Sequence, residues 1–353
     1  MDQERLNPNN DSRESTISKV VGVDATTEQE LLDYFKRKFE AEEKSFKEKE
    51  HSQELDDLIS RLNAQMKEFL GRYGVSAIEV PAKNIHIPDQ SAMNSEQLAI
   101  FGEKFKGIAA QYFLTKQRII VVEDYRKGNK LNFLQGLSHE MFHLNSFHSV
   151  QRTDRQDVVD FQLVAKSEDG ETENISLIGR RAGFSIVSRD ADAAYFRDID
   201  EAIMTELEMR FDQEYLSKIP ELEEEYQARE EAITALGART GEDIESLRKT
   251  VAALSEIPQE DGGANVRIME YSYKNERKQL NELIDNLYEK NQSEFSSRED
   301  VFKLFVEAAM SGRLLPIARL IEKTCGKGSF RELGEMTAKR AEDTKPKNND
   351  LNN

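Results

Sequence analysis

The sequence contains a single cysteine, Cys325, among 353 residues. One thiol excludes an intramolecular disulfide framework. Long apolar runs are also missing, because no stretch approaches the roughly 18 consecutive apolar residues that a membrane-spanning helix needs. The first 15 residues, MDQERLNPNNDSRES, are polar where a secretory signal is apolar. We therefore expect a cytoplasmic protein that does not enter a membrane.

Positive charge is scarce as well. Lys and Arg number 49 against 67 Asp and Glu, which gives a formal net charge of -18 at pH 7. Nucleic-acid backbones and anionic membrane surfaces attract basic proteins, so this balance argues against both kinds of partner. The chain is long enough for one large domain or two ordinary ones.

The apolar pattern predicts an α+β protein in which helices dominate. Residues 1–25 and 339–353 are polar and lack periodicity, which predicts disorder at both ends. Helical spacing predicts an N-terminal helical arm over 26–74, as one long helix or two with a break between them. Residues 75–216 are predicted to form a mixed core, and 217–338 an all-helical C-terminal subdomain.

Within the core, short β-branched runs predict a small, mostly antiparallel sheet. One of these runs is QRIIVVED, residues 117–124. The runs DVVDFQLVAK and NISLIGRRAGFSIVSRD flank the turn-rich SEDGETE and predict a hairpin. Apolar residues at helical spacing from Leu131 to Leu144 predict a helix that begins after Gly128.

That helix contains the segment GLSHEMFHLNSFH, residues 136–148, which holds a His-Glu-x-x-His motif. His139 and His143 are four residues apart, so both imidazoles emerge from one helix face about a turn apart. Two adjacent positions of a tetrahedral Zn²⁺ need this geometry. Glu140 is then placed to take a proton from a metal-bound water. On a helical wheel the two histidines also avoid the main apolar stripe of the helix.

Two histidines and a water leave tetrahedral zinc one protein ligand short. A third histidine in the extended metzincin pattern is excluded. Ser146 stands where that pattern has glycine, and Ser149 where it has histidine. His148 comes one position early, so we interpret it as a partly exposed polar residue at the end of the helix.

A carboxylate from a later helix is the other option. The segment DIDEAIMTELEMRF, residues 198–211, resembles the Asn/Asp-Glu-Ala-x-x-x-Glu helix of gluzincin-type zinc metallopeptidases. The resemblance implies that Glu201 is the third metal ligand. Asp198 followed by Glu201 is also typical of a helix capping box. Asp200 and Glu206 remain alternative ligands.

The same resemblance implies further roles. The family commonly has an acidic residue four positions after the ligand, bonded to a zinc-bound histidine, but Thr205 stands there. Gluzincin-like enzymes often use a tyrosine or histidine to stabilise the oxyanion. Tyr273 is the predicted catalytic residue of this kind, with Tyr271 and Tyr195 as alternatives.

Two features bear on substrate binding. In zincins an extended peptide lies along an edge strand, so the resemblance implies this role for 117–124. The unbroken Ile and Val run is equally typical of a central core strand. Arg180 and Arg181 either bind a substrate carboxylate or lie exposed on the predicted hairpin.

Together these features predict a zincin-like α+β fold and a zinc-dependent metallopeptidase that acts on a peptide or protein. Zn²⁺ would be held by His139, His143 and Glu201, with Glu140 as general base. One alternative is a regulatory protein that cleaves a single partner. Another is a non-enzymatic helical interaction protein whose zinc site is structural or degenerate.

Overall fold

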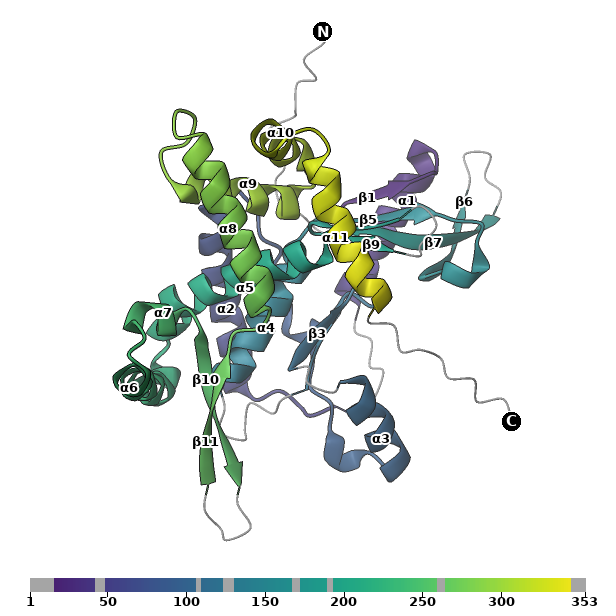
Figure 1. The fold of residues 1–353 in the computed structure, drawn as a ribbon. Helices are drawn as coiled ribbons and strands as arrows, with labels where there is room; N and C mark the ends of the chain where they lie inside the picture. Colours follow the sequence, from purple (N-terminus) through teal and green to yellow (C-terminus); the bar gives the residue numbers. More distant parts are fainter. Residues whose placement is uncertain are drawn as a thin grey trace, which may run out of the picture. The chain divides into compact units, whose positions relative to one another are not determined.

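A computed structural model describes residues 16–41, 48–105, 109–122, 130–166, 172–188, 193–258 and 264–343. It shows an α+β protein rich in helices, as the apolar pattern predicts (Figure 1). The chain forms two compact units. Unit 1 contains Tyr34–Asn145 and Met204–Lys274, and unit 2 contains Ile17–Asp33, Ser146–Ile203 and the residues from Asn275 onward. Across the described ranges, no helix combines the length and apolar character needed to cross a membrane.

The predicted N-terminal arm consists of two helices, α1 (Ala25–Glu40) and α2 (Gln53–Gly71). Ser52 caps α2, because its hydroxyl accepts a hydrogen bond from the amide of Leu55. The predicted arm is therefore two helices and not one long helix.

A three-stranded sheet in unit 1 has the order β2 (Ile85–His86), β4 (Arg118–Val121), β3 (Ala110–Phe113). β2 is parallel to β4, and β3 is antiparallel to it. Every residue of β4 is buried. The described part of the run, β4, is thus a central core strand, and its interpretation as an edge strand is wrong; residues 123 and 124 lie outside the described ranges. β2 and β3 form the two edges of this sheet in the described part of the chain.

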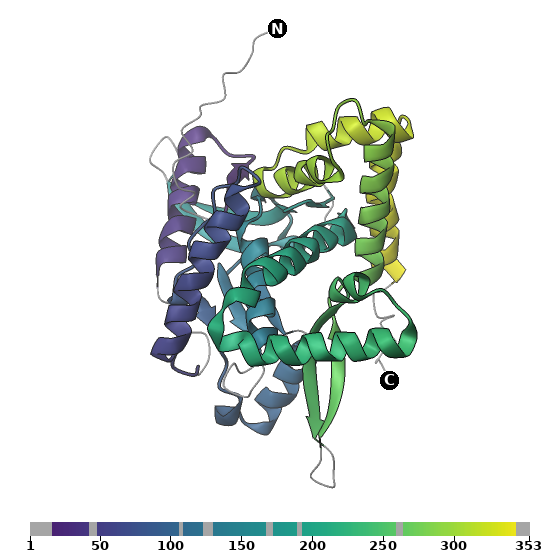
Figure 2. The same ribbon diagram turned by 90° about the vertical axis from the view of Figure 1, so that its left-hand side faces the viewer.

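Unit 1 also contains α3 (Ser95–Lys104), α4 (Lys130–Asn145), α6 (Glu223–Thr240), α7 (Ile244–Arg248) and the hairpin of β10 (Val251–Pro258) with β11 (Ala264–Glu270). Figure 2 shows α6 crossing the base of this hairpin. The prediction that 217–338 is all helical is wrong here. VAALSEIP and ANVRIME are rich in helix formers such as Ala, Leu, Glu and Met, and antiparallel pairing overrides this local preference.

Unit 2 contains a six-stranded sheet with the order β1-β5-β7-β8-β9, in which β6 also pairs with β7. Its strands are β1 (Lys19–Val21), β5 (His148–Arg152), β6 (Phe161–Lys166), β7 (Thr172–Ala182), β8 (Ser185–Val187) and β9 (Ala194–Tyr195). The predicted hairpin is confirmed as β6 and β7. β1 lies in the segment predicted to be disordered, and that prediction is wrong for 16–25 because β1 pairs in parallel with β5. Residues 1–15 lie outside the described ranges.

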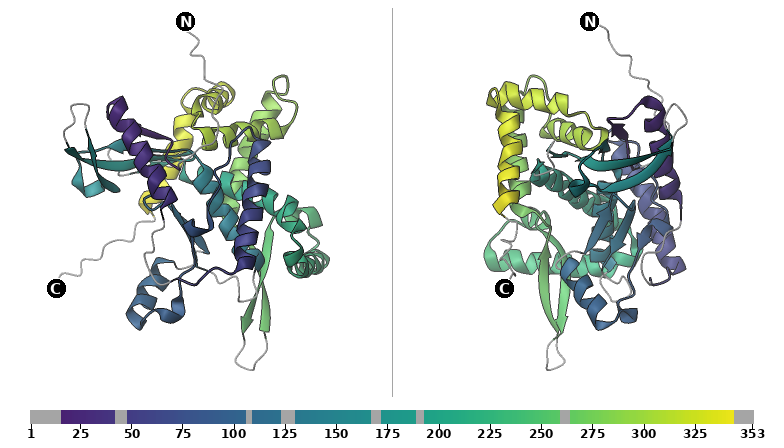
Figure 3. Two further views of the ribbon diagram at one scale, coloured as in Figure 1. Left: turned by 180° about the vertical axis from the view of Figure 1, so that it is seen from behind. Right: turned by 90° about the vertical axis from the view of Figure 1, so that its right-hand side faces the viewer.

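Four helices complete unit 2, and Figure 3 shows them gathered in green to yellow: α8 (Lys274–Lys290), α9 (Arg298–Ser311), α10 (Leu314–Cys325) and α11 (Ser329–Asp343). Ser297 and Asp300 form a capping box at the start of α9. α11 continues to Asp343, so the predicted disorder is wrong for 339–343, and 344–353 lie outside the described part. The remaining α-helix, α5 (Arg197–Glu214), begins in the segment assigned to unit 2 and ends in the segment assigned to unit 1.

Candidate metal centre

Helix α4 carries the His-Glu-x-x-His motif where the periodicity predicts it. Its apolar stripe is fully buried, while His139, Glu140 and His143 are each partly exposed. The fully buried members of the stripe are Leu134, Leu137, Met141 and Leu144. The helix therefore packs on one face and presents the motif on another.

Side-chain hydrogen bonds join both ends of α4 to other parts of unit 1. The Glu225 carboxylate accepts hydrogen bonds from the first amides, those of Lys130 (3.0 Å) and Leu131 (2.6 Å). An acidic group there also complements the helix dipole. At the other end, the side-chain oxygen of Asn145 accepts the amide of Ile78 at 2.6 Å. These contacts fix α4 on the body of unit 1.

The two imidazoles face each other through their Nε2 atoms. The Nε2 atoms of His139 and His143 lie 3.2 Å apart. Two nitrogen ligands of a tetrahedral ion with bonds of 2.0–2.1 Å would lie about 3.4 Å apart. The separation is thus close to the one that a shared metal ion requires.

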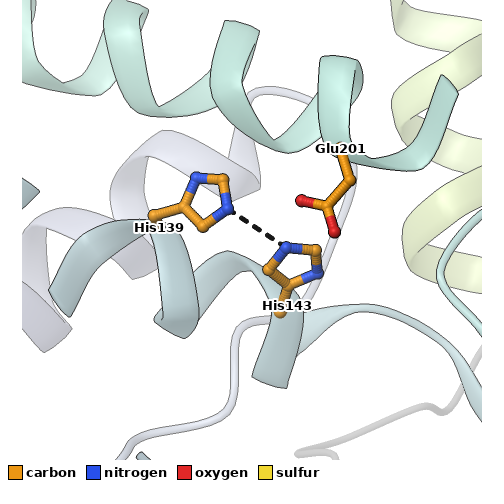
Figure 4. A group of neighbouring side chains, drawn as sticks. All are labelled: His139, His143 and Glu201. Atoms are coloured by element: carbon orange, nitrogen blue, oxygen red, sulfur yellow. Dashed lines mark hydrogen bonds between the residues drawn. The ribbon is translucent and has the colours of Figure 1, made fainter. Parts of the chain in front are cut away.

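Glu201 completes the group (Figure 4). Ligand atoms of His139, His143 and Glu201 all lie within 4.8 Å of one another. Glu201 lies on α5, whose continuous backbone fixes its place relative to the later residues of the helix. Because α5 already begins at Arg197, Asp198 lies inside the first turn. The alternative interpretation of Asp198 as the cap residue is therefore wrong.

Glu208 supports the first histidine. Its Oε2 lies 2.9 Å from Nδ1 of His139, and the two side chains are only 12% and 13% exposed. An ionised carboxylate only accepts, so a neutral imidazole bonded to it carries its proton at Nδ1 and its lone pair at Nε2. This tautomer is the one that presents Nε2 to a metal.

Glu208 was not predicted from the sequence, because the family pattern places the supporting acid four residues after the ligand, where this chain has Thr205. Glu208 comes seven residues after Glu201, which is about 700° around the helix and so within about 20° of the same direction. Both carboxylates therefore lie on one stripe of α5. A search at a spacing of seven would have found it.

The alternative ligands lie elsewhere. The Oδ1 atom of Asp200 accepts the amide of Phe184 at 2.6 Å. Oε2 of Glu206 lies 3.9 Å from Nε of Arg210 in an ion pair. Among the described residues, the group that includes the two motif histidines contains Glu201 and neither of these acids.

His148 does not end the helix. The chain leaves α4 at Asn145, and His148 opens strand β5, where it pairs with Ala182. Its side chain is 2% exposed. The prediction of a partly exposed residue is wrong, because strand pairing buries a position that helical periodicity would leave open.

The carboxylate of Glu140 is bound to strand β3: its Oε2 accepts the amide of Tyr112 at 2.6 Å. The amide of Val122 donates to the carbonyl of Ala109, and Ala110 pairs with Val121 in the antiparallel register. Backbone groups alternate in direction along a strand. The amide of Tyr112 therefore points away from β4, toward the outer edge of β3, and Glu140 lies at that edge.

The three candidate tyrosines have different environments. Tyr271 is 3% exposed and its hydroxyl donates to the carboxylate of Asp212. Burial and that carboxylate raise the pKa of Tyr271 well above its ordinary value. Tyr273 is 38% exposed, has a φ of 55° and directly precedes α8. Tyr195 lies in β9. The catalytic role of Tyr273 stays a prediction.

The arginines of the hairpin have structural contacts. Arg181 donates to the carbonyls of Ala308 (2.7 Å) and Gly312 (2.6 Å), and so binds the C-terminal end of α9. Burial lowers its pKa to about 10. Nε of Arg180 donates to the side chain of Gln151 at 2.7 Å. Arg181 therefore anchors α9 to the sheet, and a role for either arginine in substrate binding stays a prediction.

No family model matches this chain, and neither the curated proteins nor the solved structures contain a match to it. The function is therefore argued from the chemistry of the site.

Proposed function

We propose that the protein is a zinc-dependent metallopeptidase of the gluzincin type. The observation that carries the proposal is the convergence of the Nε2 atoms of His139 and His143 with the carboxylate of Glu201. Such a two-histidine, one-carboxylate set is a ligand combination of catalytic zinc sites, which keep a fourth position for water.

The donor set fits zinc in a second respect. A metal-bound histidine usually donates its other ring N–H to a carboxylate, which fixes the ring and its tautomer. Glu208 provides this contact to His139 at 2.9 Å. The group thus has three ligands and a supporting carboxylate from two helices.

Each residue then has a defined part in hydrolysis. Bound zinc polarises a carbonyl and makes water acidic enough to attack it at neutral pH. His139, His143 and Glu201 would hold the ion, while Glu140 would accept a proton from the attacking water at its carboxylate and pass it to the leaving amine.

The proposed substrate is an extended peptide, and strand β3 supports this choice. Tyr112 directs its backbone groups to the outer edge of β3, where Glu140 lies. A peptide that adds to this edge as a further strand would place one of its amide planes beside the carboxylate. We place the reaction in the cytoplasm, in keeping with one cysteine in 353 residues.

The first test is metal content by mass spectrometry, on protein purified without chelator or nickel resin. We expect about one zinc per chain in the wild type and its loss in His143→Ala and Glu201→Gln. Glu206→Gln is the matched control, because it removes a nearby acid of the same helix and should keep the metal. A wild-type protein without metal would overturn the proposal and favour the helical interaction protein.

The second test is hydrolysis of a quenched fluorescent peptide library. Glu140→Gln should keep the metal and lose cleavage by several orders of magnitude, because the general base is gone. Cleavage of one protein partner but of no library peptide would favour the regulatory alternative. Equal cleavage by the variant and the wild type would contradict the role of Glu140.

A further inference from the structure

A buried network of charged and phenolic groups lies one turn beyond Glu208 on α5. Its centre is Asp212, whose side chain is 0% exposed. The carboxylate accepts hydrogen bonds from Nη1 of Arg229 (2.7 Å) and from the hydroxyls of Tyr226 and Tyr271. We call these four residues the Asp212 network. Because buried charges are costly unless they are paired, each charge here has its partner in a fixed place.

The network reaches the motif helix through one backbone carbonyl of β10. The carbonyl of Ala252 accepts Nη1 of Arg229 at 2.8 Å and Nε2 of Gln135 at 2.9 Å. Gln135 lies on α4 and is buried. A continuous chain of hydrogen bonds therefore runs from α4, through β10 and α6, to Asp212 on α5.

Both ends of this series of hydrogen bonds lie four residues from a residue of the candidate metal centre. Gln135 comes four residues before His139 on α4, and Asp212 comes four residues after Glu208 on α5. Four residues are about one helical turn. The network thus joins the two helices one turn away from the bond between His139 and Glu208.

On α5 the relevant carboxylates form one stripe. Glu208 and Asp212 come seven and eleven residues after Glu201, which is about 700° and 1100° of rotation, so all three point within about 20° of one direction. A shift of α5 by a single residue would turn the stripe by about 100°. Holding Asp212 in place therefore holds both glutamates on the side of the histidines.

We propose that Asp212, Arg229, Tyr271 and Gln135 are positioning residues that set the register of α5 against α4. Their hydrogen bonds fix Asp212 in place, the rigid helix transmits this to Glu208, and Glu208 orients His139. The role in metal binding rests on the function proposed above. The effect on the hydrogen bond between His139 and Glu208 does not rest on that function, because this hydrogen bond forms without metal.

Two conservative variants test the proposal. Gln135→Met and Tyr271→Phe each delete one hydrogen bond of the chain at nearly constant volume. Glu230→Gln is the matched control, because it breaks an exposed ion pair between α6 and Arg248 and leaves the network intact. Circular dichroism confirms that each variant folds, and Tyr226→Phe replaces any variant that does not.

The metal-free readout is the rate at which the His139 Nδ1 proton exchanges with solvent, measured by nitrogen-edited NMR. The signal of this proton is assigned by its disappearance in Glu208→Gln. Zinc affinity by chelator competition and the visible spectrum of the cobalt-loaded protein are measured alongside. A bond that only stabilises the fold would change neither the spectrum nor the affinity. We expect exchange to accelerate at least tenfold and zinc to bind about 10–100 times more weakly, as for loss of other supporting contacts.

The outcomes separate the two proposals. Faster exchange in both variants supports the positioning role even if the wild type binds no zinc, a result that overturns only the metal site. Exchange equal to that of the wild type and of the Glu230→Gln control overturns the positioning role, whatever the protein binds.

Discussion

Replacing Tyr271 by phenylalanine should change the pH dependence of stability in a way that the structure specifies. The hydroxyl is buried and donates to the carboxylate of Asp212. Removing a buried hydrogen bond to a charged group lowers the free energy of unfolding by about 1.5–3 kcal/mol. At pH 8 we therefore expect the variant to be less stable than the wild type by this amount.

The difference should shrink at alkaline pH. Burial, followed by the Asp212 carboxylate, raises the pKa of Tyr271 well above its ordinary value. In the unfolded chain a tyrosine ionises near pH 10. Above that pH the folded state holds a proton that the unfolded state has lost, so stability falls by about 1.4 kcal/mol per pH unit for this group. Phenylalanine removes this contribution, so the gap between the two stability curves should narrow as the pH rises above about 10.

Urea unfolding followed by far-ultraviolet circular dichroism measures both effects, since the sequence has no tryptophan for fluorescence. Curves are collected from about pH 8 upward, over the range in which tyrosine ionises. Glu230→Gln is the control, and its curve should run parallel to that of the wild type. A gap between wild type and Tyr271→Phe that stays constant or widens with pH would refute the reasoning.

Three further predictions concern single contacts. Gly183→Ala should lower the free energy of unfolding, measured in urea, by about 1–3 kcal/mol. The position has a φ of +59°, and a Cβ there would lie 2.2 Å from Oδ1 of Asp200. An unchanged unfolding midpoint would contradict this. Glu208→Gln should weaken zinc binding about 10–100-fold by chelator competition, since a neutral amide holds His139 less firmly; equal affinity would speak against the support. Arg181→Met should lower stability by about 1–3 kcal/mol, because the carbonyls of Ala308 and Gly312 lose their donor, while metal content stays unchanged; metal loss would assign Arg181 another role.

The candidate ligands were accessible to sequence reasoning because their arrangement is mostly local. A spacing of four residues on a helix places His139 and His143 on one face, whatever the rest of the fold does. Helical periodicity predicted the span of α4 closely. Glu201 needed more than periodicity, since the same residue pattern is typical of a capping box, and the resemblance of its segment to a ligand helix selected it.

Other features could not be predicted from the sequence, because long-range contacts decide them. The hairpin of β10 and β11 consists largely of helix-forming residues, and only pairing between the strands makes it a sheet. The run 117–124 has a composition that suits an edge or a centre equally well, and the presence of β2 and β3 on its two sides makes it central. His148 lies three residues beyond α4, yet its burial depends on strand β7.

By itself the sequence determined a helix-rich α+β chain, a helix that presents two histidines and a glutamate on one side, and a later acidic helix. These follow from composition and from residue spacings within single helices, where the regular backbone fixes the relative directions of nearby side chains. Only the tertiary structure decided that Glu208 supports His139, that Glu140 lies at the edge of β3, and that Asp212 with Arg229 links α5 to α4. Those contacts join residues 17 to 69 positions apart, and their formation depends on packing that no local pattern encodes.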